Sequence, residues 1–223
     1  MHAPMRRLLR TALLAVAASA LVACAQTAPG SPVSPGSSGS PAAPAAPIAT
    51  GPEAQAALAE LPAPSGVEPV LAIATVLETP EGAILCLGAV AESAPPQCGG
   101  PLLVGWDWAP FEHQETGGVR WVQGVAVEGT YDAEAQTFTQ TGAPMSAAAI
   151  TMPAIEVPAG SLDDATIEAV LADLATLQRA DVLGSWSEQG TVVLNVIADD
   201  GSVQDAVDAI YGEGVVFVIP ALR

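Results

Sequence analysis

The hydrophobic pattern divides the chain into two folded stretches. Between residues 66 and 143, apolar residues occur in short runs or alternate with polar ones, as in β-strands. Strands are predicted at 70–77, 83–90, 119–131 and 137–139. Short strands separated by turn residues are typical of a small barrel or sandwich, and we expect an OB-like β-barrel.

The second stretch, residues 144–223, mixes helical and strand periods. Helices are predicted at 161–178 (with Ser161 as the N-cap) and 202–211, and strands at 182–187, 191–198 and 215–219. An Ala-rich segment at 145–152 is expected to add an opening strand. The order is then βαββαβ, the ferredoxin-like arrangement, or αββαβ without that strand, and the fold class is α+β.

Residues 1–23 have the pattern of an export signal. Arg6, Arg7 and Arg10 precede an apolar run of small residues, Thr11 to Ala23, which as a helix spans only about 20 Å and is too short for a membrane crossing. The segment Leu21-Val22-Ala23-Cys24 resembles a bacterial lipobox. That resemblance implies that Cys24 becomes the first residue and carries a lipid on the extracytoplasmic side of the cell membrane. The alternative is an ordinary secretory signal.

Residues 24–65 are expected to be a disordered linker behind the lipidated cysteine. Pro, Ala, Ser and Gly dominate most of this stretch, which leaves too little apolar surface to offset the entropy of ordering. Without residues 1–23, 3 Arg face 24 acidic residues. This charge excludes a nucleic-acid partner and attachment to anionic lipid by charge, so the membrane partnership is predicted to be covalent.

Cys86 and Cys98 remain once Cys24 carries the lipid. An even pair of cysteines in an exported chain predicts a disulfide. Eleven residues separate the two cysteines, whereas redox pairs normally have the spacing C-x-x-C, so we interpret the bond as structural.

The sequence around these cysteines is the most distinctive part of the chain. Cys86-Leu87-Gly88, Pro95 to Pro101 (P-P-Q-C-G-G-P) and Gly105 to Trp108 follow one another closely. Together they resemble a family of uncharacterised lipoproteins and secreted proteins of actinobacteria. The resemblance implies an exported location and the disulfide, and it implies no catalytic residue.

Three tryptophans gather in this aromatic-poor chain. Trp106, Trp108 and Trp121, if exposed together, form a platform on which a sugar or another flat ligand stacks. The alternative is that the indoles fill the barrel core.

Catalytic and metal-binding motifs give weaker signals. His113 lies between Glu112 and Glu115, but one histidine is too few for a typical zinc site or a conventional catalytic triad, and we expect a loop residue. Asp199, Asp200 and Asp205 fit helix capping better than a calcium loop. No metal or cofactor is predicted.

These observations favour a non-catalytic lipoprotein of the cell envelope, a binding or structural module whose partner is another envelope protein or a glycan. A carboxylate-dependent hydrolase is the first alternative, and a cleft with two acids of raised pKa would distinguish it. A domain like a protease inhibitor or propeptide is the second. Its mark would be an exposed sheet face or a protruding tail near Ala221 to Arg223.

Overall fold

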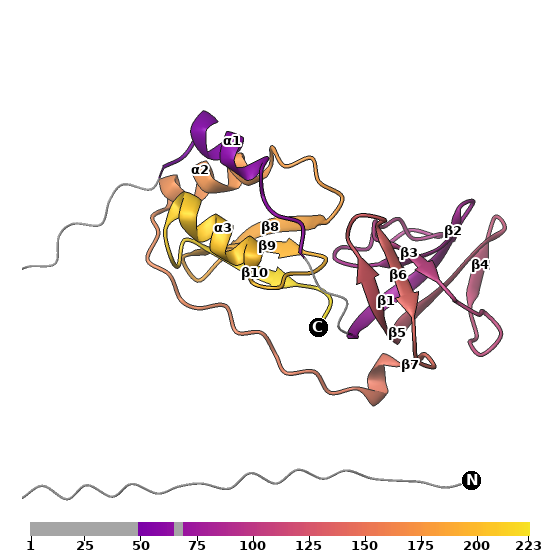
Figure 1. Cartoon of the computed structure of the whole chain (residues 1–223). Coiled ribbons are helices and arrows are strands. Elements are labelled where there is room, and N and C mark those ends of the chain that lie inside the picture. Colours follow the sequence, from indigo (N-terminus) through magenta and orange to yellow (C-terminus); the bar gives the residue numbers. More distant parts are fainter. Residues whose placement is uncertain (1–48, 65–68) are drawn as a thin grey trace, which may run out of the picture. The chain divides into compact units, whose positions relative to one another are not determined.

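The computed structural model describes residues 49–64 and 69–223 (Figure 1). The predicted signal, Cys24 and the first part of the linker, up to residue 48, lie outside the described residues. The described chain is α+β, as the hydrophobic pattern predicts.

The first folded stretch forms a closed, mixed barrel. Its strands are β1 (Val70–Thr79), β2 (Gly82–Cys86), β3 (Leu102–Val104), β5 (Val119–Asp132) and β6 (Thr137–Gln140). Their order is β1-β2-β3-β6-β5, and pairing of β1 with β5 closes the barrel. Strands β3 and β6 are parallel, and the other neighbours are antiparallel. Two short strands, β4 (Gln114–Thr116) and β7 (Met145–Ser146), pair with β5 outside the ring.

Alternation along the strands builds the barrel core. Ala72, Ala74 and Val76 of β1 point inward, where they meet the fully buried Phe138. Gly129 of β5 lies directly beside Phe138, because a Cβ at this position would lie 2.4 Å from the Phe138 ring. The core therefore requires a residue without a side chain at this point of the wall.

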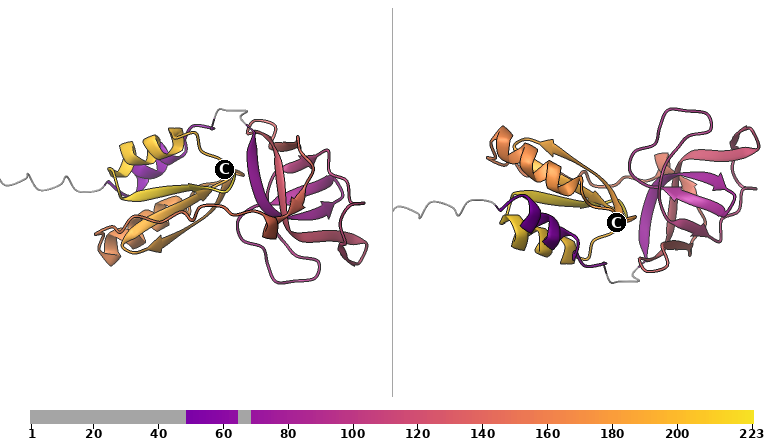
Figure 2. Two further views of the ribbon diagram at one scale, coloured as in Figure 1. Left: turned by 90° about the horizontal axis from the view of Figure 1, so that it is seen from below. Right: turned by 90° about the horizontal axis from the view of Figure 1, so that it is seen from above.

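The second folded stretch is a three-stranded sheet covered by helices. Its strands are β8 (Val182–Glu188), β9 (Thr191–Val196) and β10 (Val216–Pro220), in the order β10-β9-β8. The helices are α1 (Pro52–Leu58), α2 (Asp164–Leu174) and α3 (Ser202–Tyr211), and their apolar sides pack on the same face of β9 (Figure 1). Viewed from the helix side, α1 lies between α2 and α3 (Figure 2, right).

The opening strand expected at 145–152 does not join this sheet. Met145 and Ser146 pair with β5 of the barrel, and residues 147–149 form a short 3-10 helix (η1, Ala147–Ala149). The ferredoxin-like arrangement is therefore not confirmed, and the described elements from α2 to β10 follow the order αββαβ. The N-cap of α2 is Asp163, whose carboxylate accepts a hydrogen bond from Thr166 N at 2.7 Å, and not Ser161.

Helix α1 is a second difference from the sequence interpretation, which places residues 52–58 in the linker. Leu58 is fully buried in the core of the helix-covered sheet. The buried carboxylate of Asp173 in α2 accepts hydrogen bonds from Gly51 N at 2.9 Å and Gln55 Nε2 at 2.8 Å. Arg179 donates to the carbonyl of Leu61 just after α1. The expected linker is thus shorter than predicted, because its last part is bound by residues far along the chain.

The end of the chain returns to the barrel. Arg223 and Leu71 exchange two backbone hydrogen bonds, at 2.6 and 3.2 Å. Leu222 and Ile197 belong to the hydrophobic cluster of the barrel. None of the helices among the described residues has the length and apolar character needed to cross a membrane.

Candidate functional site

Residues 105–113, called here the aromatic loop, leave the barrel where β3 ends at Val104. Local hydrogen bonds shape the loop: the Asp107 carboxylate accepts from Ala109 N at 2.9 Å, and Phe111 N donates to the carbonyl of Trp108 at 3.2 Å. An aspartate that accepts from the backbone two residues later stabilises a turn. The loop is therefore folded by its own residues and not by β-pairing.

The aromatic side chains of the loop contact one another. The rings of Trp106 and Phe111 are stacked, with centroids 5.3 Å apart. Trp108 lies edge-on to Trp106, with centroids 5.7 Å apart, and edge-on to His113 at the same separation. Stacked and edge-on pairs are the favourable arrangements of aromatic quadrupoles, so the four rings form one ordered group.

Arg120 of the barrel wall contacts the aromatic loop and at the same time forms an ion pair with Glu78. The guanidinium of Arg120 lies 4.9 Å from the centre of the Trp108 ring, within the range of a cation–π contact. Its Nε and one terminal nitrogen donate to the two carboxylate oxygens of Glu78, at 2.8 and 2.6 Å. The hydrogen bond from Arg120 holds the pKa of Glu78 below its usual range, and the same bond raises the pKa of Arg120.

Strand alternation explains why these groups meet. Glu78 lies two residues after the inward-pointing Val76, and Arg120 lies two residues before the inward-pointing Val122. Both side chains are therefore on the inner side of their strands, at the end of the barrel. Trp106, Trp108 and Phe111 pack half-buried against the barrel core at this end. The aromatic loop thus closes one end of the barrel and keeps part of its ring surface exposed.

Trp121 does not belong to the proposed platform. It is only 4 % exposed and packs with Leu77 and Cys86 in a separate cluster. Because it is the neighbour of Arg120 on a β-strand, its side chain points to the opposite face of the sheet. The structure brings Trp106 and Trp108 together and places Trp121 in a separate cluster, outside the barrel core that the alternative interpretation expected the indoles to fill.

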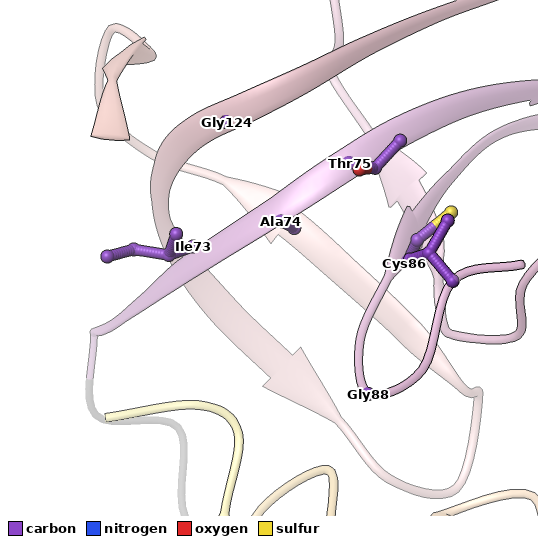
Figure 3. Close-up of a pocket in the computed structure, with 7 residues that line it drawn as sticks. Ile73, Ala74, Thr75, Cys86, Gly88 and Gly124 are labelled. Atoms are coloured by element: carbon purple, nitrogen blue, oxygen red, sulfur yellow. The ribbon is translucent and has the colours of Figure 1, made fainter. Parts of the chain in front are cut away.

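The disulfide between Cys86 and Cys98 is present, with the Cα atoms 5.6 Å apart. It joins the end of β2 to the loop that follows and lies over Trp121. Beside it is a shallow hollow of about 220 Å³ on the outer wall of the barrel, lined by Ile73, Thr75, Cys86 and Gly124 among others (Figure 3). Thr75 is the polar side chain among the lining residues, so the hollow offers little chemistry beyond shape.

The remaining candidate residues have structural surroundings. His113 is exposed, and its Nδ1 lies 3.3 Å from the carbonyl of Phe111. The Asp199 carboxylate accepts from the N–H groups of Gly201 and Val203 at the start of α3, as expected for a cap. Within residues 49–64 and 69–223, no three His, Cys, Asp or Glu side chains are grouped in a way that could hold a metal ion.

The sequence patterns did not single out Trp186 as a candidate. Trp186 lies on β8 and is 40 % exposed, the largest aromatic side chain presented to solvent by the described residues. It pairs with the buried Val193 of β9. The alternation Leu183, Ser185, Ser187 on one side and Gly184, Trp186, Glu188 on the other could have placed it on one sheet face, but alternation does not tell whether that face is covered.

We compared the chain with protein-family models, with curated proteins and with solved structures, and none of them matches it.

Proposed function

We propose that this protein is an exported lipoprotein, fastened to the extracytoplasmic side of the cell membrane through Cys24, that serves as a binding module. The lipobox-like Leu21 to Cys24 and the charged, apolar segment before it support the anchor. The disulfide between Cys86 and Cys98 supports export, because such bonds persist in oxidising compartments.

For the fold, we propose that the barrel is of the OB-like type. The strand order β1-β2-β3-β6-β5, its closure through β1 and β5, and the parallel pairing of β3 with β6 support this assignment. Fold alone assigns no activity, because barrels of this size carry many functions. The function has to be argued from the aromatic loop.

The observation that carries the binding proposal is the ordered ring group of the aromatic loop. Trp108 is fixed by Arg120 on the barrel and by Trp106 and His113 in the loop, so its exposed surface is held in place before any ligand arrives. A ligand that stacks on a preorganised indole loses less entropy on binding. Exposed Asp107 and Glu112 lie beside the rings in sequence and offer acceptors for hydroxyl groups. A glycan of the cell envelope has both the apolar C–H faces and the hydroxyls that this surface fits.

The observed geometry favours this proposal over the two alternatives. A catalytic acid needs a raised pKa, whereas the pKa of Glu78, which is hydrogen-bonded to Arg120 beside Trp108, is lowered. An inhibitor-like tail would protrude, whereas Leu222 is buried and Arg223 is hydrogen-bonded to Leu71 of β1.

The anchor is tested by the Cys24→Ala substitution. We expect the unchanged chain in the membrane fraction of cells that express it, and release from that fraction after the substitution. Ser93→Ala, an exposed substitution in the disulfide loop, is the control and should leave the distribution unchanged. Persistence of the Cys24→Ala protein in membranes would refute the lipid anchor.

Ligand binding is tested by titrating soluble peptidoglycan fragments while tryptophan fluorescence is recorded. We expect saturable quenching that Trp108→Ala abolishes. Trp186→Ala removes the other exposed indole and serves as the matched control, which should retain the response. Absence of any saturable change with the unchanged protein would refute the glycan as ligand.

A further inference from the structure

The two edges of the helix-covered sheet differ in how their backbone groups are satisfied. At the β10 edge, the carboxamide of Gln204 in α3 donates through Nε2 to the carbonyl of Val216 at 2.9 Å. Its Oε1 accepts from Val218 N at 2.8 Å. The side chain therefore makes the two hydrogen bonds that a neighbouring peptide group would make, and it blocks this edge against another strand.

The β8 edge is open. Gln189 (φ 50) and Gly190 (φ 78) form a two-residue turn between β8 and β9, in which the flanking Glu188 and Thr191 face each other. The direction of backbone hydrogen bonding alternates along a strand. The N–H and C=O groups of Trp186 therefore also point toward β9, whereas those of Ser185 and Ser187 point outward. Within the part of the chain that the structure describes, no hydrogen bond is made by these outward groups.

The middle of this edge strand lacks the usual protection against pairing. β8 contains no proline, and its one charged residue, Glu188, is its last. Charged side chains, proline and bulges are what natural edge strands use against pairing. The register shift between Val182 and Gly184 disturbs only the start of β8, so the regular stretch is 184–188. At its centre is Trp186, and a Cβ built on Gly184 would meet nothing within 4 Å.

We propose that β8 pairs antiparallel with β8 of a second copy of this chain, around a two-fold axis at Trp186. Ser185 then exchanges both backbone hydrogen bonds with Ser187 of the second copy, and the converse pair does the same. Trp186 lies opposite Trp186 of the second copy in a non-hydrogen-bonded pair, where side chains are closest. The two exposed indoles cover each other.

Charge and symmetry favour a second copy as the occupant. The regular stretch overlaps itself completely only in the register centred on Trp186. In this register Glu188, the one charge of the stretch, lies across from Gly184 of the second copy and not from another carboxylate. The pairing therefore brings no like charges together in the strands, and charges farther apart are screened beyond about 8 Å at physiological salt. The contact is small, so the dimer is expected to be weak and concentration-dependent.

A cysteine at the two-fold axis tests the register. Non-hydrogen-bonded pairs have Cα atoms about 4.5 Å apart, which is within the range of a disulfide. In the full-length chain, Trp186→Cys is expected to form a covalent dimer under mild oxidation. Ser185→Cys should crosslink much less, because residue 185 lies opposite residue 187 of the second copy and not opposite its own counterpart. Ala135→Cys, at an exposed turn of the barrel, is the control for random collision. Preferential crosslinking of Ser185→Cys, or of Trp186→Cys to a different protein only, would overturn the proposal.

A second measurement keeps Trp186 in place. Sedimentation velocity of the full-length protein in detergent over a range of concentrations is expected to show a reversible dimer. Ser187→Lys places a charge in the edge of both copies and should raise the dissociation constant at least about tenfold. Ser93→Lys adds the same charge in the disulfide loop and should not change it. A protein that stays monomeric throughout, or a dimer that Ser187→Lys leaves intact, would contradict β8 pairing.

Discussion

The guanidinium of Arg120 lies 4.9 Å from the centre of the Trp108 ring and at the same time holds the Glu78 carboxylate by two hydrogen bonds. Glu78 is on β1, Arg120 is on β5, and Trp108 is on the aromatic loop after β3. One side chain thus connects the barrel closure between β1 and β5 to the loop that we propose as the ligand contact. The half-buried Trp108 indole is thereby held in place by two strands of the barrel wall.

We predict that Arg120→Gln loosens Trp108 without unfolding the barrel. The loss of the cation–π contact and of the bond to Glu78 leaves the indole more exposed to water. Tryptophan emission should shift to longer wavelength and become more easily quenched by acrylamide, while the far-ultraviolet circular dichroism stays the same. Arg223→Gln, at the exposed arginine that ends the sequence, is the control. Unchanged emission in Arg120→Gln would mean that the loop holds Trp108 without the arginine.

Glu78 should make the stability depend on pH in the acid range. Its pKa in the folded protein lies below the ordinary value of 4.5 because Arg120 donates to the carboxylate. The stabilisation by this pair is therefore complete above about pH 4.5 and is lost as the pH falls through the lowered folded-state pKa. Thermal melts from pH 7 to pH 3 should show a shallower decline in Tm for Glu78→Gln than for the unchanged protein. Glu134→Gln, in the exposed β5–β6 turn, should follow the unchanged protein.

Removing the disulfide should lower the free energy of unfolding by about 3 kcal/mol, the amount expected for a closed loop of this length. The bond spans 12 positions in the sequence and covers the cluster around Trp121. The double variant Cys86→Ser, Cys98→Ser is to be compared with the unchanged protein in urea, with and without reductant. Reductant should affect only the unchanged protein. Labelling of free thiols at these two positions in the native protein would contradict the bond.

The periodicity of the sequence predicted most elements because their burial is local. The alternation in Val119 to Tyr131 and the helical spacing of Ile167, Val170 and Leu174 each report one buried face, and the structure has β5 and α2 there. The segment 145–152 carries no such information. Its small side chains fit a strand, a 3-10 helix or a coil equally, and only pairing with β5 decides its first two residues.

Long-range partners explain the other differences. Ala54, Leu58 and Leu61 have helical spacing, but the Pro- and Ala-rich surroundings hide it, and the acceptor for Gly51 is Asp173, 122 positions away. For the aromatic residues, alternation alone separates Arg120 from Trp121 on β5. It does not reveal that Arg120 reaches Trp108 across the barrel end, because that contact depends on closure of the barrel.

Asp173→Ala should destabilise the protein by about 2 to 4 kcal/mol, because it leaves the N–H of Gly51 and the amide of Gln55 without their acceptor in a buried place. Urea unfolding gives the change in free energy, and hydrogen exchange should show faster exchange in residues 52–58. Asp164→Ala, exposed in the first turn of the same helix, should change stability by less than about 0.5 kcal/mol. Equal effects of the two substitutions would show that Asp173 does not fasten α1.

The position of α1 also decides where mechanical load enters the protein. A pull on the chain from the side of residue 49 reaches Gly51 first, and Asp173 and Arg179 resist it through their bonds to residues on either side of α1. Tension is thus taken up by the helices over β8 to β10 before it is transmitted to Val70 and the barrel. A pull from this side would therefore reach the aromatic loop only after the contacts of α1 had given way.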